Sequence, residues 1–134
     1  MILYRPVGLK ELELIAESDF KSFPPRLLEQ PIFYPVLNFE YAARIAGEWN
    51  TTSGSFAGFV TKFEVDDEYA RCFDVQVVGD RTHQELWVPA EDLEEFNRHI
   101  VGSITVEEAF YGKQFVGDID TETNLPSHIV QKLK

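Results

Sequence analysis

The order in which extended and helical patterns follow one another is the feature that most constrains the fold of this chain. Residues 2–7 alternate like a strand, and residues 8–19 carry apolar side chains at helical spacing. A short extended run at 32–34 follows, and Asn38 is a good N-cap for a second amphipathic helix. Beyond residue 56 the patterns are mostly extended. Strands concentrated late in the chain favour an α+β fold over a doubly wound parallel sheet.

The second half of the chain reads as a series of strands with one inserted helix. A longer strand is predicted at 56–65, and residues 73–78 and 82–88 form a hairpin pattern around the turn 79–81. Pro89 suits the first turn of a helix, which we expect Gly102 to end. A final strand is predicted at 104–111. These elements predict one domain over residues 1–112, followed by a C-terminal tail at 113–134.

Composition narrows the classes of partner. The 134 residues include 12 Lys and Arg against 23 Asp and Glu, a formal net charge of −11. Such a surface repels phosphate backbones, so nucleic acid is not an expected partner. No apolar run approaches the roughly 20 residues that a membrane span needs, and no membrane association is expected. Because the N-terminus has no secretory-signal pattern, we expect a cytoplasmic protein.

The polar residues at 83–85, which enter an otherwise apolar strand, are the strongest candidate for chemistry. Strand alternation places His83, Glu85 and Trp87 on one face. A carboxylate beside an indole is partly desolvated and well oriented. The alternative is that Glu85 is an ordinary exposed strand residue. The three histidines stand in different elements without ligand spacing, so no metal site is predicted.

Two arginines are further candidates. Arg5 shares a strand face with Leu3 and Val7, an unusual place for a cation, and it either forms a salt bridge with an acidic neighbour or serves a ligand. Arg26 lies in a proline-rich loop, where it either reaches a phosphate group or is simply solvated.

Several segments, in this order, resemble the ADP-ribosyltransferase family. Residues 2–6 (ILYRP) resemble the family's first core strand, which ends in a His or Arg that contacts NAD. Residues 32–35 and 38–46 look like its aromatic-bearing strand and the helix after it. Residues 83–88 (HQELWV) resemble the strand that carries the catalytic glutamate, and 104–111 fits the closing strand. The likeness covers roughly residues 2–111 and depends on the order and spacing of the pieces.

The resemblance implies a fold and a set of roles. It implies a split β-sheet core with two N-terminal helices and one inserted helix, holding NAD as co-substrate between two small sheets. It places Glu85 at the ribose hydroxyl, where a carboxylate stabilises the oxocarbenium-like transition state. It places Arg5 against the adenosine ribose or phosphates and Tyr34 beside the nicotinamide, although Tyr34 also fits an ordinary core position. Tyr4 and His83 are the remaining expected cofactor contacts.

The expected function is therefore transfer of ADP-ribose from NAD to an acceptor that the sequence leaves open. A protein is one candidate acceptor. His83 stands where arginine-modifying relatives carry Glu or Gln, so the acceptor chemistry is in doubt. An NAD-dependent RNA phosphotransferase is a variant on the same fold, which the acidity disfavours. The alternative class is a non-catalytic interaction or immunity-type module on the same scaffold.

Overall fold

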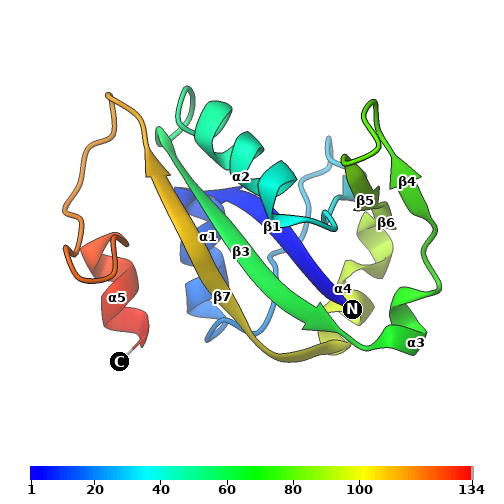
Figure 1. Ribbon diagram of the computed structural model, residues 1–134. Coiled ribbons are helices and arrows are strands. Elements are labelled where there is room, and N and C mark those ends of the chain that lie inside the picture. Colours follow the sequence, from blue (N-terminus) through cyan, green and yellow to red (C-terminus); the bar gives the residue numbers. More distant parts are fainter. Residues whose placement is uncertain (134) are drawn as a thin grey trace.

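The computed structural model describes residues 1–133 and shows an α+β fold, which confirms the class predicted from the element order (Figure 1). All strand pairs are antiparallel. The largest sheet has three strands in the order β1-β3-β7, and two further sheets have two strands each. The strands are β1 (Ile2–Gly8), β2 (Ile32–Phe33), β3 (Ala57–Val65), β4 (Val75–Val77), β5 (Gln84–Leu86), β6 (Val88–Pro89) and β7 (Ile100–Tyr111).

A single residue, Val36, joins the three-stranded sheet to the β4-β5 pair. Val36 pairs with Tyr4 of β1 on one side and with Glu85 of β5 on the other. The Val36 amide donates to the Tyr4 carbonyl at 2.7 Å, and the Tyr4 amide donates back at 2.8 Å. On the other side, the Leu86 amide donates to the Pro35 carbonyl at 2.9 Å. The two halves of the β structure therefore meet along one short seam.

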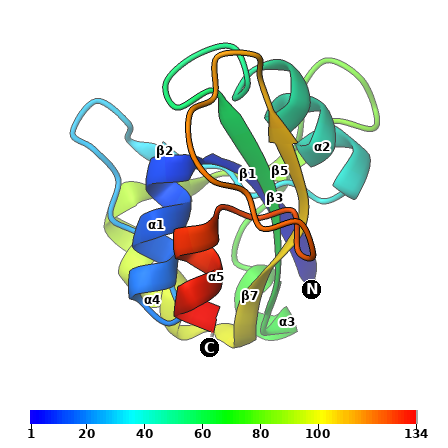
Figure 2. The same cartoon turned by 90° about the vertical axis from the view of Figure 1, so that its left-hand side faces the viewer.

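Helices cover both faces of the three-stranded sheet. Figure 2 shows α1 and α5 side by side on one face and α2 on the opposite one. Asn38 caps α2 as predicted, since its side chain accepts from the Tyr41 amide at 2.7 Å. Within residues 1–133 no helix is both long and apolar enough to cross a membrane. The helices are α1 (Leu9–Glu17), α2 (Phe39–Glu48), α3 (Asp67–Ala70), α4 (Leu93–Arg98) and α5 (Ser127–Leu133).

The central strand β3 is buried on both faces, which explains its continuous apolar sequence. One face meets α2, and Gly58 permits the close approach: a Cβ there would lie 2.1 Å from the Ala46 carbonyl oxygen. The other face meets a phenylalanine-rich core that includes Phe23, Phe33 and Phe96. Their rings make tilted and edge-to-face contacts with centroids 5.0 and 5.6 Å apart, an arrangement that aromatic rings prefer.

The second half of the chain departs from the predicted boundaries. The strand expected over 82–88 is interrupted at Trp87, because Val88 leaves β5 and pairs with Phe33 in a different sheet. The helix expected to run to Gly102 ends at Arg98, and Gly102 instead lies inside β7 with φ +76°. The segment that the sequence leaves as a tail carries α5, and Leu125 and Ile129 join the core.

Candidate functional site

A groove of about 490 Å³ lies beside the seam at Val36, and it contains three of the predicted site residues. A volume of this size falls within the roughly 300–1,000 Å³ of small-molecule sites. Most of its walls are apolar or aromatic, with a few polar groups among them. The lining residues are Arg5, Pro6, Tyr34, Val36, Ile45, Asn50, Val78, Glu85 and Trp87.

Two hydrogen-bond donors hold the Glu85 carboxylate in the groove, and the residue is only 8% exposed. The Trp87 indole donates to Oε1 at 2.7 Å, and the Tyr41 hydroxyl donates to Oε2 at 3.2 Å. Burial and the adjacent Glu85 carboxylate raise the pKa of the Tyr41 hydroxyl, so it remains a donor at neutral pH. A carboxylate has about four lone-pair sites, so each oxygen retains capacity for a ligand hydroxyl.

Aromatic rings surround this carboxylate. Tyr34 and Trp87 meet edge to face with centroids 6.3 Å apart, and they are 40% and 45% exposed. On the other side, the His83 ring stacks on Tyr41 at 4.3 Å. Exposed aromatic faces beside an oriented acceptor are suited to a ligand that combines a flat ring with a polyol, because the rings stack and the carboxylate accepts from hydroxyl groups.

Arg5 is engaged by an acidic neighbour, the first of the two roles considered from the sequence. Its Nε and Nη2 donate to the two carboxylate oxygens of Glu11 at 2.8 and 3.1 Å. The guanidinium carbon lies 4.6 Å from the centre of the Phe33 ring. Only Nη1 is outside this pair, with a long 3.5 Å contact to the Tyr34 carbonyl. The ion pair therefore fixes Arg5 and leaves one nitrogen to meet a ligand.

Arg5 and Glu85 leave the sheet on opposite faces although both line the groove. Tyr4, Val36 and Glu85 stand opposite one another in the pairing, so their side chains share one face. Arg5 follows Tyr4 and points to the other face, as its burial alongside Leu3 and Val7 predicted. The groove thus extends to both faces of the sheet beside the seam at Val36, since Arg5 lines it from one face and Glu85 from the other.

Two predicted cofactor contacts lie elsewhere. Tyr4 packs against Phe39 with ring centroids 6.1 Å apart, and it is not among the residues that line the groove. His83 lines a neighbouring groove of about 530 Å³ together with Arg44 and Arg81. Tyr41 separates the two grooves, since it lines the second one and hydrogen-bonds Glu85 in the first. His83 therefore meets Glu85 only through Tyr41.

Sequence reasoning missed Tyr41, Glu11 and Asn50. Tyr41 stands in the first turn of α2, where nothing in the sequence relates it to β5. Glu11 carried a signal, because an arginine on an apolar strand face needs an anion and Glu11 follows six residues later. Asn50 lines the groove just beyond α2, and its Oδ1 is buried without a hydrogen-bond partner within residues 1–133.

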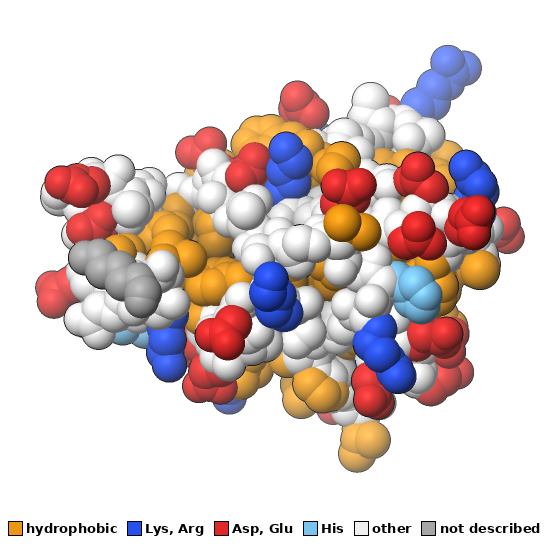
Figure 3. All heavy atoms as spheres, turned by 90° about the horizontal axis from the view of Figure 1, so that it is seen from below, with side chains coloured by type: hydrophobic (Ala, Val, Ile, Leu, Met, Phe, Trp, Pro, Cys, Tyr) orange, Lys and Arg blue, Asp and Glu red, His pale blue; other side chains and the backbone are white. Residues whose placement is uncertain are grey.

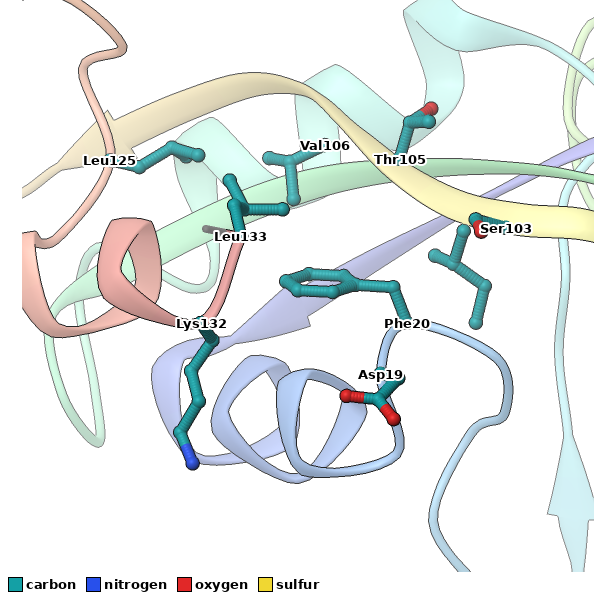
Figure 4. A pocket seen from close by; sticks show the side chains of 9 residues that line it. Asp19, Phe20, Ser103, Thr105, Val106, Leu125, Lys132 and Leu133 are labelled. Carbon is teal, nitrogen blue, oxygen red and sulfur yellow. The ribbon is translucent and has the colours of Figure 1, made fainter.

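Another groove, near the C-terminal helix, has fewer groups suited to chemistry than the Glu85 groove. Seen from below, acidic side chains are scattered over the surface, and apolar atoms are exposed in a hollow near the C-terminal helix (Figure 3). A groove of about 440 Å³ lies between α5 and β7. Its close-up shows Phe20 and Leu133 directed toward each other, with Asp19 and Lys132 at its rim (Figure 4). It has no buried, oriented polar group comparable to Glu85.

Comparisons with known proteins do not assign this chain to a family. A scan of family models and searches of curated proteins and of solved structures return no match to this chain. Within residues 1–133, no group of three or more His, Cys, Asp and Glu residues is placed to hold a metal ion. The functional interpretation therefore depends on the groove and on the segments named in the sequence.

Proposed function

We propose that the Glu85 groove binds NAD and that the protein transfers ADP-ribose to an acceptor. The observation that carries this proposal is the Glu85 carboxylate, 8% exposed and held by Tyr41 and Trp87 in an aromatic-lined groove that also contains Arg5 and Tyr34. Arg5, Tyr34 and Glu85 are three of the five positions that the resemblance singled out. The gap beside the seam at Val36 also supports an ADP-ribosyltransferase-like split core with the ligand between its halves.

The chemistry assigned to Glu85 is electrostatic. The bond between ribose C1′ and the nicotinamide nitrogen breaks, and its electron pair neutralises the pyridinium. Positive charge develops on C1′ and the ring oxygen, and a carboxylate fixed nearby stabilises that charge more strongly in a dry groove than in water. Glu85 also accepts from a ribose hydroxyl. The acceptor then forms the new bond at C1′ and releases its proton.

The aromatic residues have a binding role in this proposal. Tyr34 and Trp87 offer exposed ring surface for the nicotinamide, and Trp87 additionally orients Glu85. Arg5 contributes Nη1 to the adenosine ribose or phosphates, while Glu11 holds the rest of the guanidinium. Tyr4 has no direct ligand contact in this arrangement, and His83 acts through Tyr41.

The test is calorimetric titration with NAD, followed by measurement of nicotinamide release. The variant Glu85→Gln keeps the shape but removes the charge, and we expect it to lower the release rate about 10²- to 10³-fold with little change in NAD affinity. Glu94→Gln is the matched control, because Glu94 lies on α4 with its side chain 90% exposed. No binding and no release by the wild type at millimolar NAD would end the proposal.

A non-catalytic interaction module on this scaffold is the second candidate. The observation that favours it is the bidentate Arg5–Glu11 pair, which occupies most of the guanidinium that a ligand would use. NAD that binds in the groove without nicotinamide release, in the wild type and Glu85→Gln alike, would favour this module over the enzyme. Nicotinamide release that depends on Glu85 would exclude it.

A further inference from the structure

Two arginines lie close together on the α1 side of the groove, and one of them is paired with a carboxylate. Arg5 and Arg26 both lie over the Phe33 ring, with guanidinium carbons 4.6 and 5.9 Å from its centre. Both oxygens of Glu11 accept from Arg5, and the Glu11 charge also acts on Arg26. Arg5, Glu11 and Arg26 together, named here the arginine cluster, carry a net charge of +1 in a chain whose net charge is −11.

The second arginine has hydrogen-bonding capacity that the protein does not use. Its Nε donates to the Ile32 carbonyl at 3.1 Å, which fixes the direction of the side chain. Within residues 1–133 neither terminal nitrogen of Arg26 donates a hydrogen bond to a protein acceptor. The cluster also retains Nη1 of Arg5, which has only the 3.5 Å contact with the Tyr34 carbonyl.

The surroundings disfavour leaving this charge without an anion. Burial and the nearby charge of Arg5 lower the pKa of Arg26, while Glu11 and Tyr34 act in the opposite direction. Burial and the like charge of Arg5 thus both act against the cationic form of Arg26. A bound anion would offset both effects at once, because it neutralises the excess charge and accepts from the unused nitrogens.

We propose that the arginine cluster is an anion site that binds a phosphate group, with Arg26 as its main donor. Arg26 lines a small groove of about 250 Å³ with Glu11 and Pro25, whereas Arg5 and Tyr34 line the Glu85 groove. The cluster thus lies between the two grooves. If the Glu85 groove holds NAD, as proposed above, the ligand's diphosphate is the phosphate group that binds here.

A phosphate fits the cluster better than a carboxylate does. Guanidinium groups form paired hydrogen bonds with planar or tetrahedral oxyanions, and phosphate supplies both the charge and several acceptor oxygens. A carboxylate would offer two acceptors, and Glu11 already fills that position. The acidic surface of the rest of the chain makes non-specific phosphate binding weak, so binding at the cluster is readily distinguished from background.

The experiment measures two probes, inorganic pyrophosphate and NAD, against the wild type and three variants. Broadening of the phosphorus NMR signal of pyrophosphate measures pyrophosphate binding, and calorimetry measures NAD binding. Arg26→Gln removes the main donor, and Arg26→Lys keeps the charge without the paired geometry. Arg98→Gln is the control for net charge, because Arg98 is 67% exposed on α4, away from the cluster.

We expect wild type and Arg98→Gln to bind pyrophosphate within twofold of each other. Arg26→Gln should weaken binding roughly tenfold or more, with Arg26→Lys intermediate. An equal loss in Arg26→Gln and Arg98→Gln would show that only the net charge matters and would overturn the site. The absence of pyrophosphate binding by the wild type at about 10 mM would also overturn it, because a site with a Kd of about 0.1 mM would then be saturated.

The two proposals fail separately. Pyrophosphate binding that depends on Arg26, without any NAD binding, would support the anion site and refute the proposed function. NAD binding and Glu85-dependent nicotinamide release, together with pyrophosphate binding that Arg26→Gln leaves unchanged, would support the function and overturn the anion site.

Discussion

Breaking the Arg5–Glu11 pair from either side should destabilise the protein, whereas removing both partners should not. The two side chains are 10% and 23% exposed, so each charge depends on the other for most of its compensation. Glu11→Met leaves the Arg5 charge over Phe33 with no anion, and Arg5→Met leaves Glu11 without its donors. Methionine matches the length of glutamate, is shorter than arginine, and suits the helix at position 11.

The magnitude follows from the degree of burial. Removing one partner of a fully buried ion pair costs about 3–5 kcal/mol, while exposed pairs contribute only about 0.2–1 kcal/mol. Because Glu11 retains some solvent contact, we expect each single variant to lose about 2–3 kcal/mol. The double variant Arg5→Met/Glu11→Met replaces the pair by apolar packing beside Phe33, and we expect it within about 1 kcal/mol of wild type.

Urea denaturation of the four proteins measures these free energies of unfolding, and comparable m values would confirm that the same surface is exposed in each. Additive losses in the double variant would refute the reasoning, because two independent contributions would then replace one shared interaction. The double variant also isolates the ligand role of Arg5. A stable protein with weakened NAD affinity would show that Nη1 reaches the ligand.

Two further predictions concern β3 and β7. Gly58→Ala should lower the free energy of unfolding, measured in urea, by about 1–3 kcal/mol, because its Cβ would lie 2.1 Å from the Ala46 carbonyl oxygen. Gly47→Ala on α2 is the control: its Cβ would lie 3.4 Å from the Phe110 ring, and the variant should be neutral or stabilising. Burial raises the pKa of Tyr111 to about 12, against about 10 when unfolded, so its contribution holds below pH 10 and is lost as pH rises toward 12. Tyr111→Phe should flatten that decline in free energy of unfolding, and an unchanged slope would contradict the assignment.

Local patterns predicted the first half of the fold well. The alternation of β1 correctly placed Arg5 on the face of Leu3 and Val7, and Asn38 caps α2 because its side chain satisfies an amide that the helix leaves free. These features depend on interactions within a few residues. The predictions failed where tertiary pairing decides the outcome. Val88 shares an apolar pattern with β5 but pairs with Phe33 in another sheet.

In the candidate site, too, the features set by local sequence were predicted and those set by tertiary contacts were not. Strand alternation predicted that Glu85 and Trp87 share a face, and the hydrogen bond between their side chains confirms it. Tyr41 was not predictable as a partner of Glu85, because the contact joins residues 44 positions apart through the pairing at Val36. Tyr34 and Glu85 were expected together from a resemblance, and they do line one groove. Their role there remains a prediction.

The seam at Val36 has a mechanical consequence. A wide sheet resists bending because many neighbouring hydrogen bonds must distort together, whereas here one residue and its flanking amides carry the connection between β1 and β5. Small changes of twist between the halves therefore cost little backbone bonding. Glu85 belongs to one half and Arg5 to the other, so such a rotation opens or narrows the space between them. Because backbone pairing between the halves is so limited, their shared core, which contains Leu3 of β1 and Leu86 of β5, fixes their relative position and with it the width of the groove.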